Sequence, residues 1–272
     1  MSISKKETKR VTVQTLQAMK AKGEKITMLT AYDYTMAKII DGAGIDIILV
    51  GDSAANVMAG YETTLPMTLE AMIYHASAVV RACSRALVVA DLPFGTYQSD
   101  PQRALDSAIR MMKESGAQAV KLEGGREIGE GIRRILEAGI PVIGHLGLTP
   151  QSINKFGGYG LRAKQQDEAQ ELKDDARYLQ ELGCSAIVLE KIPSALAKEV
   201  TQNLSVPTIG IGAGHEVDGQ VLVSQDFFGM FVDYKPKFVR QYLNLHELMT
   251  AAVSQYITDV KAQTFPNESE QY

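Results

Sequence analysis

The sequence predicts a single (β/α)8 barrel, the TIM-barrel fold. About eight short stretches are wholly apolar rather than alternating, which is typical of parallel strands that are covered on both faces. Helical stripes stand between most of these stretches, and such alternation favours one closed parallel sheet. No GxGxxG follows the first strand, so a Rossmann start is not favoured, although a doubly wound open sheet is the structural alternative.

Apolar spacing and stop signals place the elements of the first half. Residues 12–22 repeat apolar side chains at helical spacing, and Gly23 is a good helix stop. We expect this helix to close the bottom of the barrel. Thr68 resembles an N-cap, and Asp100 caps a helix that has Pro101 at its first position and ends at Gly116. The first four strands are expected at residues 25–32, 45–50, 86–90 and 119–122.

The second half repeats the pattern. Apolar side chains recur at helical spacing before Gly139 and again before Gly183, which predicts two helices. Between them, the polar, Gly-rich residues 148–166 predict a long loop of the kind that is often functional. Further helices are expected at residues 194–203 and 238–261, and strands at residues 141–144, 186–189, 207–211 and 219–223. We expect one catalytic domain over residues 1–272, with a mobile tail at about 262–272.

Composition excludes several classes of partner. The chain has 272 residues, 45% hydrophobic content and a net charge of −4, without a block of Lys or Arg, which argues against nucleic acid. No secretory h-region and no apolar run of about 20 residues is visible, so we expect a cytoplasmic protein without a membrane span. Cys83 and Cys184 lie far apart, which favours buried thiols over a disulfide or a nucleophile.

Ionisable residues follow several predicted strands. In a barrel of this kind the chemistry lies at the carboxyl ends of the strands. Four carboxylates at one mouth could not all stay ionised without compensation, and a divalent cation would supply it. Oxygen ligands without cysteine favour Mg²⁺ or Mn²⁺ over zinc. The residues at these ends are Asp52, Ser53, Asp91, Lys121, Glu123, His145, Glu190 and the turn at residues 212–214.

Each of these residues also has a purely structural interpretation. A carboxylate at a strand end can cap the next helix or bind a loop N–H. Lys121 and Glu123 are two apart on one strand, so they share a face and could simply pair. His145 could be a hydrogen-bonded barrel residue. The GIGAG turn could bind phosphate through its N–H groups or be only a tight turn.

Seven blocks of the sequence, in order, resemble the ketopantoate hydroxymethyltransferase (3-methyl-2-oxobutanoate hydroxymethyltransferase) family. Together they extend over roughly residues 11–248. They are VGDSAANVMAGYETTLPMT, VVADLPFGTYQ, AVKLEGG, PVIGHLGLTPQS, FGGYG, IVLEKIP and VPTIGIGAGHEVDGQVLVSQD. The resemblance implies a (β/α)8 barrel, a homodecamer, and one-carbon transfer from 5,10-methylenetetrahydrofolate to 3-methyl-2-oxobutanoate on the way to pantothenate and coenzyme A.

The resemblance also implies a role for each site residue. Asp52, Asp91 and Glu123 match the metal-binding carboxylates of the family. Ser53 and Lys121 match residues that hold the 2-oxo acid, together with Asp52 and Asp91. Glu190 matches the proposed proton acceptor, and His145 matches a histidine near the site whose role is left open.

Two rival functions stay open at this point. A Mg²⁺-dependent lyase or mutase of the phosphoenolpyruvate mutase/isocitrate lyase type would use a similar barrel, but it is expected to carry a reactive Cys in a K-[KR]-C-G-H-type segment, which this sequence lacks. A non-catalytic barrel is the other rival, and the intact set of ionisable residues argues against it. Whether the one-carbon unit is attacked as an iminium or as formaldehyde is also open.

Overall fold

The computed structural model describes residues 9–231 and 235–272. Its internal contacts divide the chain into two compact units, Met1–Leu222 and Val223–Tyr272. The first unit holds all the strands of the described ranges and the candidate site. The expectation that all 272 residues form one catalytic domain stays a prediction.

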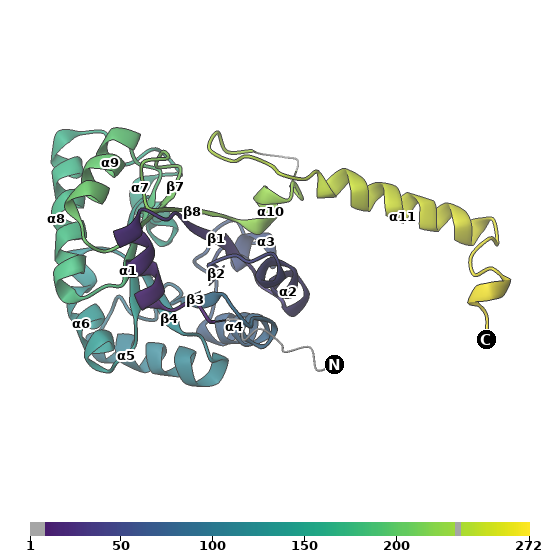
Figure 1. Cartoon of the computed structure of the whole chain (residues 1–272), viewed down its shortest axis with the longest axis horizontal. Helices are drawn as coiled ribbons and strands as arrows, with labels where there is room; N and C mark the ends of the chain where they lie inside the picture. Colours follow the sequence, from purple (N-terminus) through teal and green to yellow (C-terminus); the bar gives the residue numbers. More distant parts are fainter. Residues whose placement is uncertain (1–8, 232–234) are drawn as a thin grey trace. The chain divides into compact units, whose positions relative to one another are not determined.

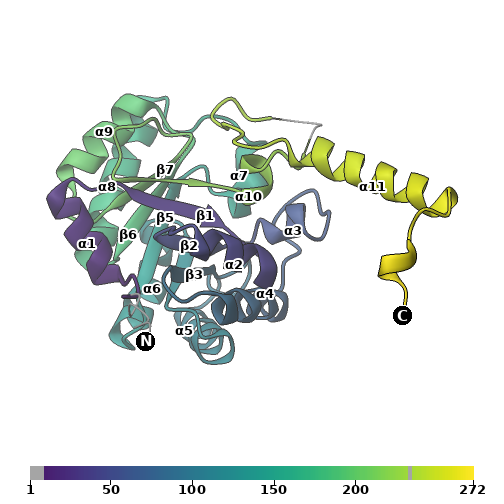
Figure 2. The same cartoon turned by 45° about the vertical axis from the view of Figure 1, so that its right-hand side comes forward.

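Eight parallel strands of the first unit close into a barrel in chain order, with β8 pairing back to β1 (Figures 1 and 2). This confirms the predicted (β/α)8 barrel. The strands run β1 Ile26–Thr30, β2 Ile47–Val50, β3 Leu87–Asp91, β4 Ala119–Glu123, β5 Val142–Gly147, β6 Ala186–Glu190, β7 Thr208–Ile211 and β8 Gly219–Leu222. β2, β3 and β4 are buried along their whole length, including Lys121 and Glu123 of β4, which is typical of parallel strands that are covered on both faces.

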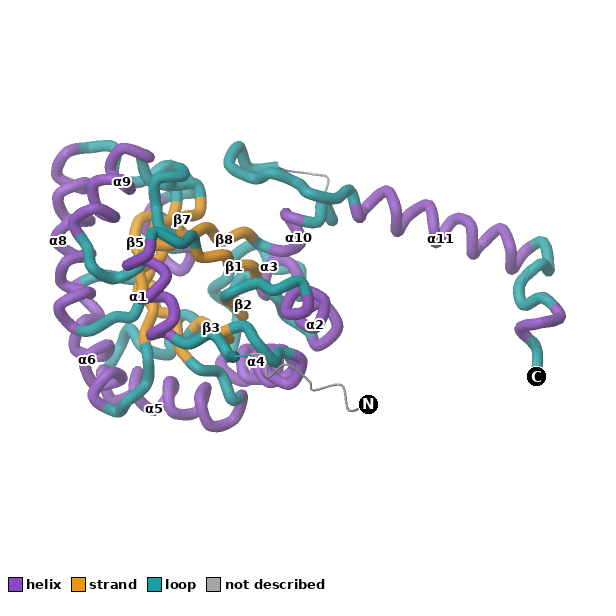
Figure 3. The backbone as a smooth tube through the Cα atoms, in the orientation of Figure 1, coloured by secondary structure: helices purple, strands orange, loops and turns teal. Residues whose placement is uncertain are grey.

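Helices surround these strands, and the predicted caps begin two of them (Figure 3). The Thr68 side chain accepts a hydrogen bond from the N–H of Ala71 at 3.2 Å, and Asp100 accepts one from Gln102 at 2.7 Å. The principal helices are α1 Val13–Lys22, α2 Tyr34–Gly42, α4 Leu69–Ala82, α5 Pro101–Arg110, α6 Gly129–Glu137, α8 Gln166–Leu182 and α9 Ser194–Asn203. A π-helical turn, η1 Met111–Ser115, extends α5 up to Gly116.

The helix α1 closes the bottom of the barrel, as predicted. Leu16 is fully buried in a core cluster with Met28 and other inward side chains of the strands. The N–H of Val11 donates to the carbonyl oxygen of Arg85, just before β3, at 2.8 Å. Burial of one Leu side chain contributes about 1.5–3 kcal/mol, so this helix covers the amino ends of the strands at a gain in stability.

The structure also corrects several element boundaries. β5 runs to Gly147 rather than to residue 144, so His145 lies inside a strand. Residues expected as loops contain short helical turns, because four or five residues are too few to show a helical period. These turns are α3 Ala54–Val57, η2 Arg126–Ile128, η3 Pro150–Ser152, α7 Ile153–Phe156 and α10 Ser224–Phe227.

The second unit consists of α10, the long helix α11 Leu245–Lys261 and the turn η4 Glu268–Glu270. The prediction that its long helix begins at residue 238 was wrong. The N–H groups of Tyr242 and Leu245 donate to Phe227 and Phe228 at 2.9 Å, and the rings of Phe227 and Tyr242 stack at 4.5 Å. These contacts hold residues 238–244, which were expected to be helical, out of a helix. The Asn244 side chain then caps α11. No helix in the described ranges is both long and apolar enough to cross a bilayer.

Candidate active site at the carboxyl ends of the strands

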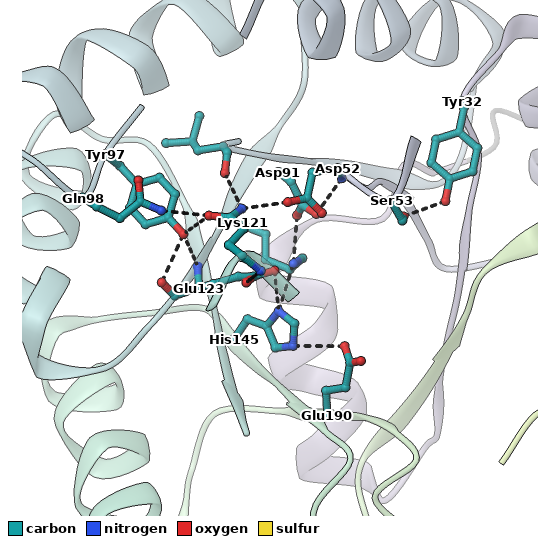
Figure 4. Close-up of polar contacts among 12 residues, drawn as sticks. Tyr32, Asp52, Ser53, Asp91, Tyr97, Gln98, Lys121, Glu123, His145 and Glu190 are labelled. Atoms are coloured by element: carbon teal, nitrogen blue, oxygen red, sulfur yellow. Dashed lines mark hydrogen bonds and ion pairs between the residues drawn. The ribbon is translucent and has the colours of Figure 1, made fainter. Parts of the chain in front are cut away.

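The register of neighbouring strands brings the predicted residues onto one face. Asp91 of β3 lies opposite Lys121 of β4, and Glu123 of β4 lies opposite His145 of β5. Two residues further along β5, Gly147 lies opposite Glu190 of β6. Because side chains two apart share a face, and paired residues of parallel strands point the same way, this register directs the charged side chains together into the barrel mouth (Figure 4).

Asp52 and Ser53 come from the turn after β2 and join this group. The backbone N–H of Asp52 donates to Asp91 Oδ2 at 3.0 Å. Ser53 Oγ lies 2.8 Å from the hydroxyl of Tyr32, a buried ring that follows β1. A side chain at Gly51 would meet Ser53 Oγ at 2.6 Å, so glycine at this position leaves room for the serine hydroxyl.

Lys121 is a buried cation at the centre of the group. Its Nζ lies 3.0 Å from Asp91 Oδ1 and 3.1 Å from His145 Nδ1. Burial alone would lower the pKa of Lys121, but the carboxylates of Asp91 and Glu123 outweigh it and raise the pKa. Lys121 therefore stays charged at neutral pH. The Lys121–Glu123 pair considered from the sequence is replaced by a wider network, in which the ammonium contacts Asp91.

The carboxylates of the group have divergent pKa values. Burial, together with the charges of Glu123 and Asp91, raises the pKa of Asp52 well above its ordinary value. Burial also raises the pKa of Asp91, although Lys121 opposes the shift. For Glu123 burial is outweighed by His145 and Lys121, and its pKa is lowered. Crowded carboxylates of this kind are the electrostatic condition that a bound cation relieves.

His145 links Glu123 to Glu190. Its Nδ1 lies 3.5 Å from Glu123 Oε1, and its Nε2 lies 3.3 Å from Glu190 Oε2. Burial and the charge of Lys121 would lower the pKa of His145, but the two carboxylates outweigh them and raise it. The side chain of Glu190 is 15% exposed, whereas that of Glu123 is 3% exposed. Glu190 is thus the carboxylate of this pair that a ligand in the mouth can reach.

The Gly-rich segment predicted to be a functional loop is attached to the residue after Glu190. The ammonium of Lys191 donates to the carbonyl oxygen of Tyr159, and the N–H of Arg162 donates to the carbonyl oxygen of Lys191 at 2.8 Å. Burial and then the charges of Glu190 and Asp52 raise the pKa of Tyr159. The loop therefore lies within electrostatic reach of the carboxylate group.

Three polar residues of the site were not assigned a role from the sequence: Tyr97, Gln98 and Gln151. The Gln151 side chain donates to Asp52 Oδ2 at 2.8 Å, and its backbone N–H donates to Glu123 Oε2 at 2.9 Å. The Tyr97 hydroxyl accepts the N–H of Glu123 at 3.0 Å. These residues lie in loops after β3 and β5, inside the blocks DLPFGTYQ and LGLTPQS, but no local pattern marks them as partners of the carboxylates.

The donor set suits a hard cation that also takes ligands from water or substrate. Asp91 Oδ1 is buried, and the Lys121 ammonium, 3.0 Å away, offsets part of its charge. Within the described ranges, however, no three His, Cys, Asp or Glu side chains form a group that could hold a metal as they stand. Mg²⁺ commonly keeps several waters and uses only one or two carboxylates, so members of the set Asp52, Asp91 and Glu123 could serve as its ligands without forming a closed cage.

The cysteines lie outside this arrangement, and Gly214 of the GIGAG turn has a packing explanation. Cys83 follows α4 and Cys184 precedes β6, so both lie near the amino ends of strands. Both are buried and free, and burial raises the pKa of each thiol to about 12. Gly214 has a positive φ of 84°, and a side chain there would meet Ser194 Cβ at 2.5 Å, which accounts for glycine by close packing.

Comparison with known proteins relates this chain to one family. The family model of ketopantoate hydroxymethyltransferase matches residues 10–268. Proteins called 3-methyl-2-oxobutanoate hydroxymethyltransferase are 66% identical in Flavobacterium johnsoniae and 64% in Christiangramia forsetii, in both cases over 100% of each chain. In Salinibacter ruber such a protein is 61% identical over 97% of this chain and 99% of its own length.

Solved structures show the same fold at low sequence identity. A putative phosphonomutase from Burkholderia cenocepacia has a TM-score of 0.65 and 14% identity, over 90% of this chain and 99% of its own. A 2,3-dimethylmalate lyase of the PEP mutase/isocitrate lyase superfamily has a TM-score of 0.56 and 16% identity, over 94% and 88%. At this identity the likeness supports the barrel alone. The family model over residues 10–268 and the relatives that match over their full length show the family as well as the fold: the chain belongs to the ketopantoate hydroxymethyltransferase family.

Proposed function

We propose that this chain transfers a hydroxymethyl group from 5,10-methylenetetrahydrofolate to 3-methyl-2-oxobutanoate and forms 2-dehydropantoate (ketopantoate). In the overall reaction the C3–H bond of the oxo acid is replaced by a C3–CH₂OH bond. One water molecule supplies the hydroxyl group, and tetrahydrofolate is released. Membership of the family supports the reaction class, and the site geometry supports the roles given below.

One observation carries the proposal most directly. A charged, buried Lys121 stands among three buried carboxylates, and the more accessible Glu190 lies across His145 from them. A small 2-oxo acid presents a carboxylate, a ketone oxygen and an acidic C–H. The site offers a cation for the first, a place for a divalent metal at the second and a base for the third.

Substrate binding would use Lys121 and Ser53. The ammonium of Lys121 would offset the carboxylate charge of the oxo acid. Burial raises the pKa of Tyr32, so its phenol stays protonated and can donate to Ser53 Oγ. The hydrogen of Ser53 can then be donated to a substrate oxygen.

Asp52, Asp91 and Glu123 would hold Mg²⁺ beside the ketone of the substrate. When bound there, Mg²⁺ would polarise the ketone and stabilise negative charge on its oxygen, an effect of several kcal/mol. The three side chains come from the ends of β2, β3 and β4, so one ion could neutralise charge from three strands. The part of Asp52 and Asp91 in substrate binding would be indirect, through this ion.

Glu190 would remove the C3 proton. Its carboxylate lies 3.3 Å from His145 Nε2, and its side chain is partly accessible. The electron pair of the C–H bond then forms the new C–C bond to the one-carbon unit. A positioned base of this kind contributes about 10²–10⁴-fold to the rate.

Exchange of the C3 proton tests this assignment without the folate. Wild type with Mg²⁺ should exchange that proton of 3-methyl-2-oxobutanoate with deuterated water, followed by proton NMR. Glu190→Gln should slow the exchange by about 10²–10⁴-fold. Glu137→Gln removes a carboxylate that pairs with Arg133 on the surface of α6, and it should exchange as wild type does. Exchange at the wild-type rate in Glu190→Gln would remove Glu190 from the role of base.

The donor and the metal are tested by product formation. Ketopantoate should appear only with methylenetetrahydrofolate present, should vanish with a chelator and should return with added Mg²⁺. Formation from free formaldehyde at the same rate would favour prior release of formaldehyde over attack on an iminium. A homodecamer stays a prediction from the resemblance, and a cytoplasmic location with only small molecules as partners stays a prediction from the sequence.

A further inference from the structure

The amide of Gln151 lies between two carboxylates that come from different strands. Its Nε2 donates to Asp52 Oδ2 at 2.8 Å, and its backbone N–H donates to Glu123 Oε2 at 2.9 Å. The residue itself lies in η3, in the loop after β5, and it is buried. One residue therefore binds one oxygen of each carboxylate, while the other oxygen of Glu123, Oε1, lies 3.5 Å from His145 Nδ1.

The orientation of this amide is fixed by its own neighbours. Its Oε1 accepts from the Tyr97 hydroxyl at 2.7 Å and from Gln98 Nε2 at 2.8 Å. Its Nε2 donates also to the carbonyl oxygen of Leu92 at 3.0 Å. Both hydrogens and both lone pairs are thus in use. A flipped amide would bring its NH₂ against the NH₂ of Gln98 and its oxygen against Asp52, so only one orientation satisfies the contacts.

We infer that Gln151 is a positioning residue, which holds Asp52 and Glu123 in the arrangement that receives the divalent cation. The inference rests on the proposed function, because it assigns a task toward the proposed Mg²⁺. Gln151 would touch neither the substrate nor the ion. It acts through the two carboxylates that it binds.

The physical need for such a residue follows from charge. Asp52, Asp91 and Glu123 are three buried carboxylates that share the site with one buried ammonium, Lys121, so the group carries excess negative charge and its carboxylates repel one another. Hydrogen bonds from a neutral, fixed amide hold two of them in place without adding a charge. Loss of an outer partner of this type commonly costs about 10–100-fold in metal affinity.

Binding of Mn²⁺ to the purified full-length protein tests the inference. The loss of the free Mn²⁺ signal in electron paramagnetic resonance gives the dissociation constant without any turnover. Gln151→Met keeps the length of the side chain and removes its donors and acceptor, and we expect about 10–100-fold weaker Mn²⁺ binding. Gln118→Met is the matched control. The Gln118 amide accepts from Val88 N at 2.8 Å and donates to Gly116 O at 3.0 Å, at the opposite ends of the strands. It should lower stability but leave Mn²⁺ affinity unchanged.

The outcomes separate the inference from the proposed function. Mn²⁺ binding to Gln151→Met at wild-type affinity overturns the role of Gln151 alone, as does equal weakening in Gln118→Met. Absence of Mn²⁺ binding to wild type overturns both. Gln98→Met changes an exposed residue and removes one of the two donors to the Gln151 amide, so it tests the same role if Gln151→Met fails to fold. We expect a smaller weakening in the same direction, and an unchanged affinity there overturns the inference.

Discussion

Gly147 ends β5 opposite Glu190 of β6, and a single methyl group at this position should disturb both stability and activity. Its φ is +92°, a conformation that L side chains rarely adopt. A Cβ atom there would lie 2.3 Å from the carbonyl oxygen of Glu190 and 2.7 Å from Ile192 Cγ2. That carbonyl oxygen already accepts the N–H of Leu148 at 2.8 Å, so it has little freedom to move.

The structure allows the cost of Gly147→Ala to be separated into two parts. Left-handed backbone costs a non-glycine residue about 1–2 kcal/mol. Relief of the overlap requires Glu190 to move by about 1 Å, and overpacking of this kind costs about 1–3 kcal/mol. We therefore expect a loss of about 2–5 kcal/mol in the free energy of unfolding. Because the displaced residue is Glu190 itself, exchange of the substrate C3 proton should fall as well.

Gly139→Ala supplies the matched control. Gly139 has a φ of +83°, and a Cβ there would have no neighbour within 4 Å. Gly139→Ala should lower the free energy of unfolding only by the cost of left-handed backbone, about 1–2 kcal/mol, and should keep wild-type proton exchange. Urea unfolding at one protein concentration measures both variants, since assembly would shift apparent stability. Equal losses in the two variants would refute the argument from the Glu190 overlap.

Two further predictions concern groups outside the site. Burial would raise the pKa of Asp41, but hydrogen bonds from Ala86 and Ser84 outweigh it, so its folded pKa lies below the unfolded value of about 3.9. The stability that ionised Asp41 contributes to the folded state is therefore present above the unfolded pKa and is lost as pH falls through the folded pKa. Asp41→Asn should therefore lower the unfolding temperature at neutral pH, with a difference that narrows below about pH 4, and a constant difference would contradict this. Cys184 is buried with a thiol pKa of about 12, so iodoacetamide should label it only at the rate of unfolding. Rapid labelling of native protein, read by mass spectrometry, would contradict its burial.

The fold was readable from the sequence because its determinants are local. Each strand is a short apolar run, and signals such as Thr68 and Gly183 mark where helices begin and end. The charged residues that follow the strands were readable for the same reason, since they come directly after apolar runs. Short turns such as η3, and the start of α11 at Leu245, were not readable, because contacts with distant residues decide them.

Local signals along the chain were thus enough to predict the barrel and the kinds of side chain at its mouth. Only the tertiary structure decided which of them meet, because strand register is a relation between segments that lie 20 or more residues apart. That register pairs Asp91 with Lys121 and Glu123 with His145, and so directs their side chains to a common centre. The task of Gln151 could not be read along the chain, since its partner Asp52 is 99 residues away and closure of the barrel alone brings them together.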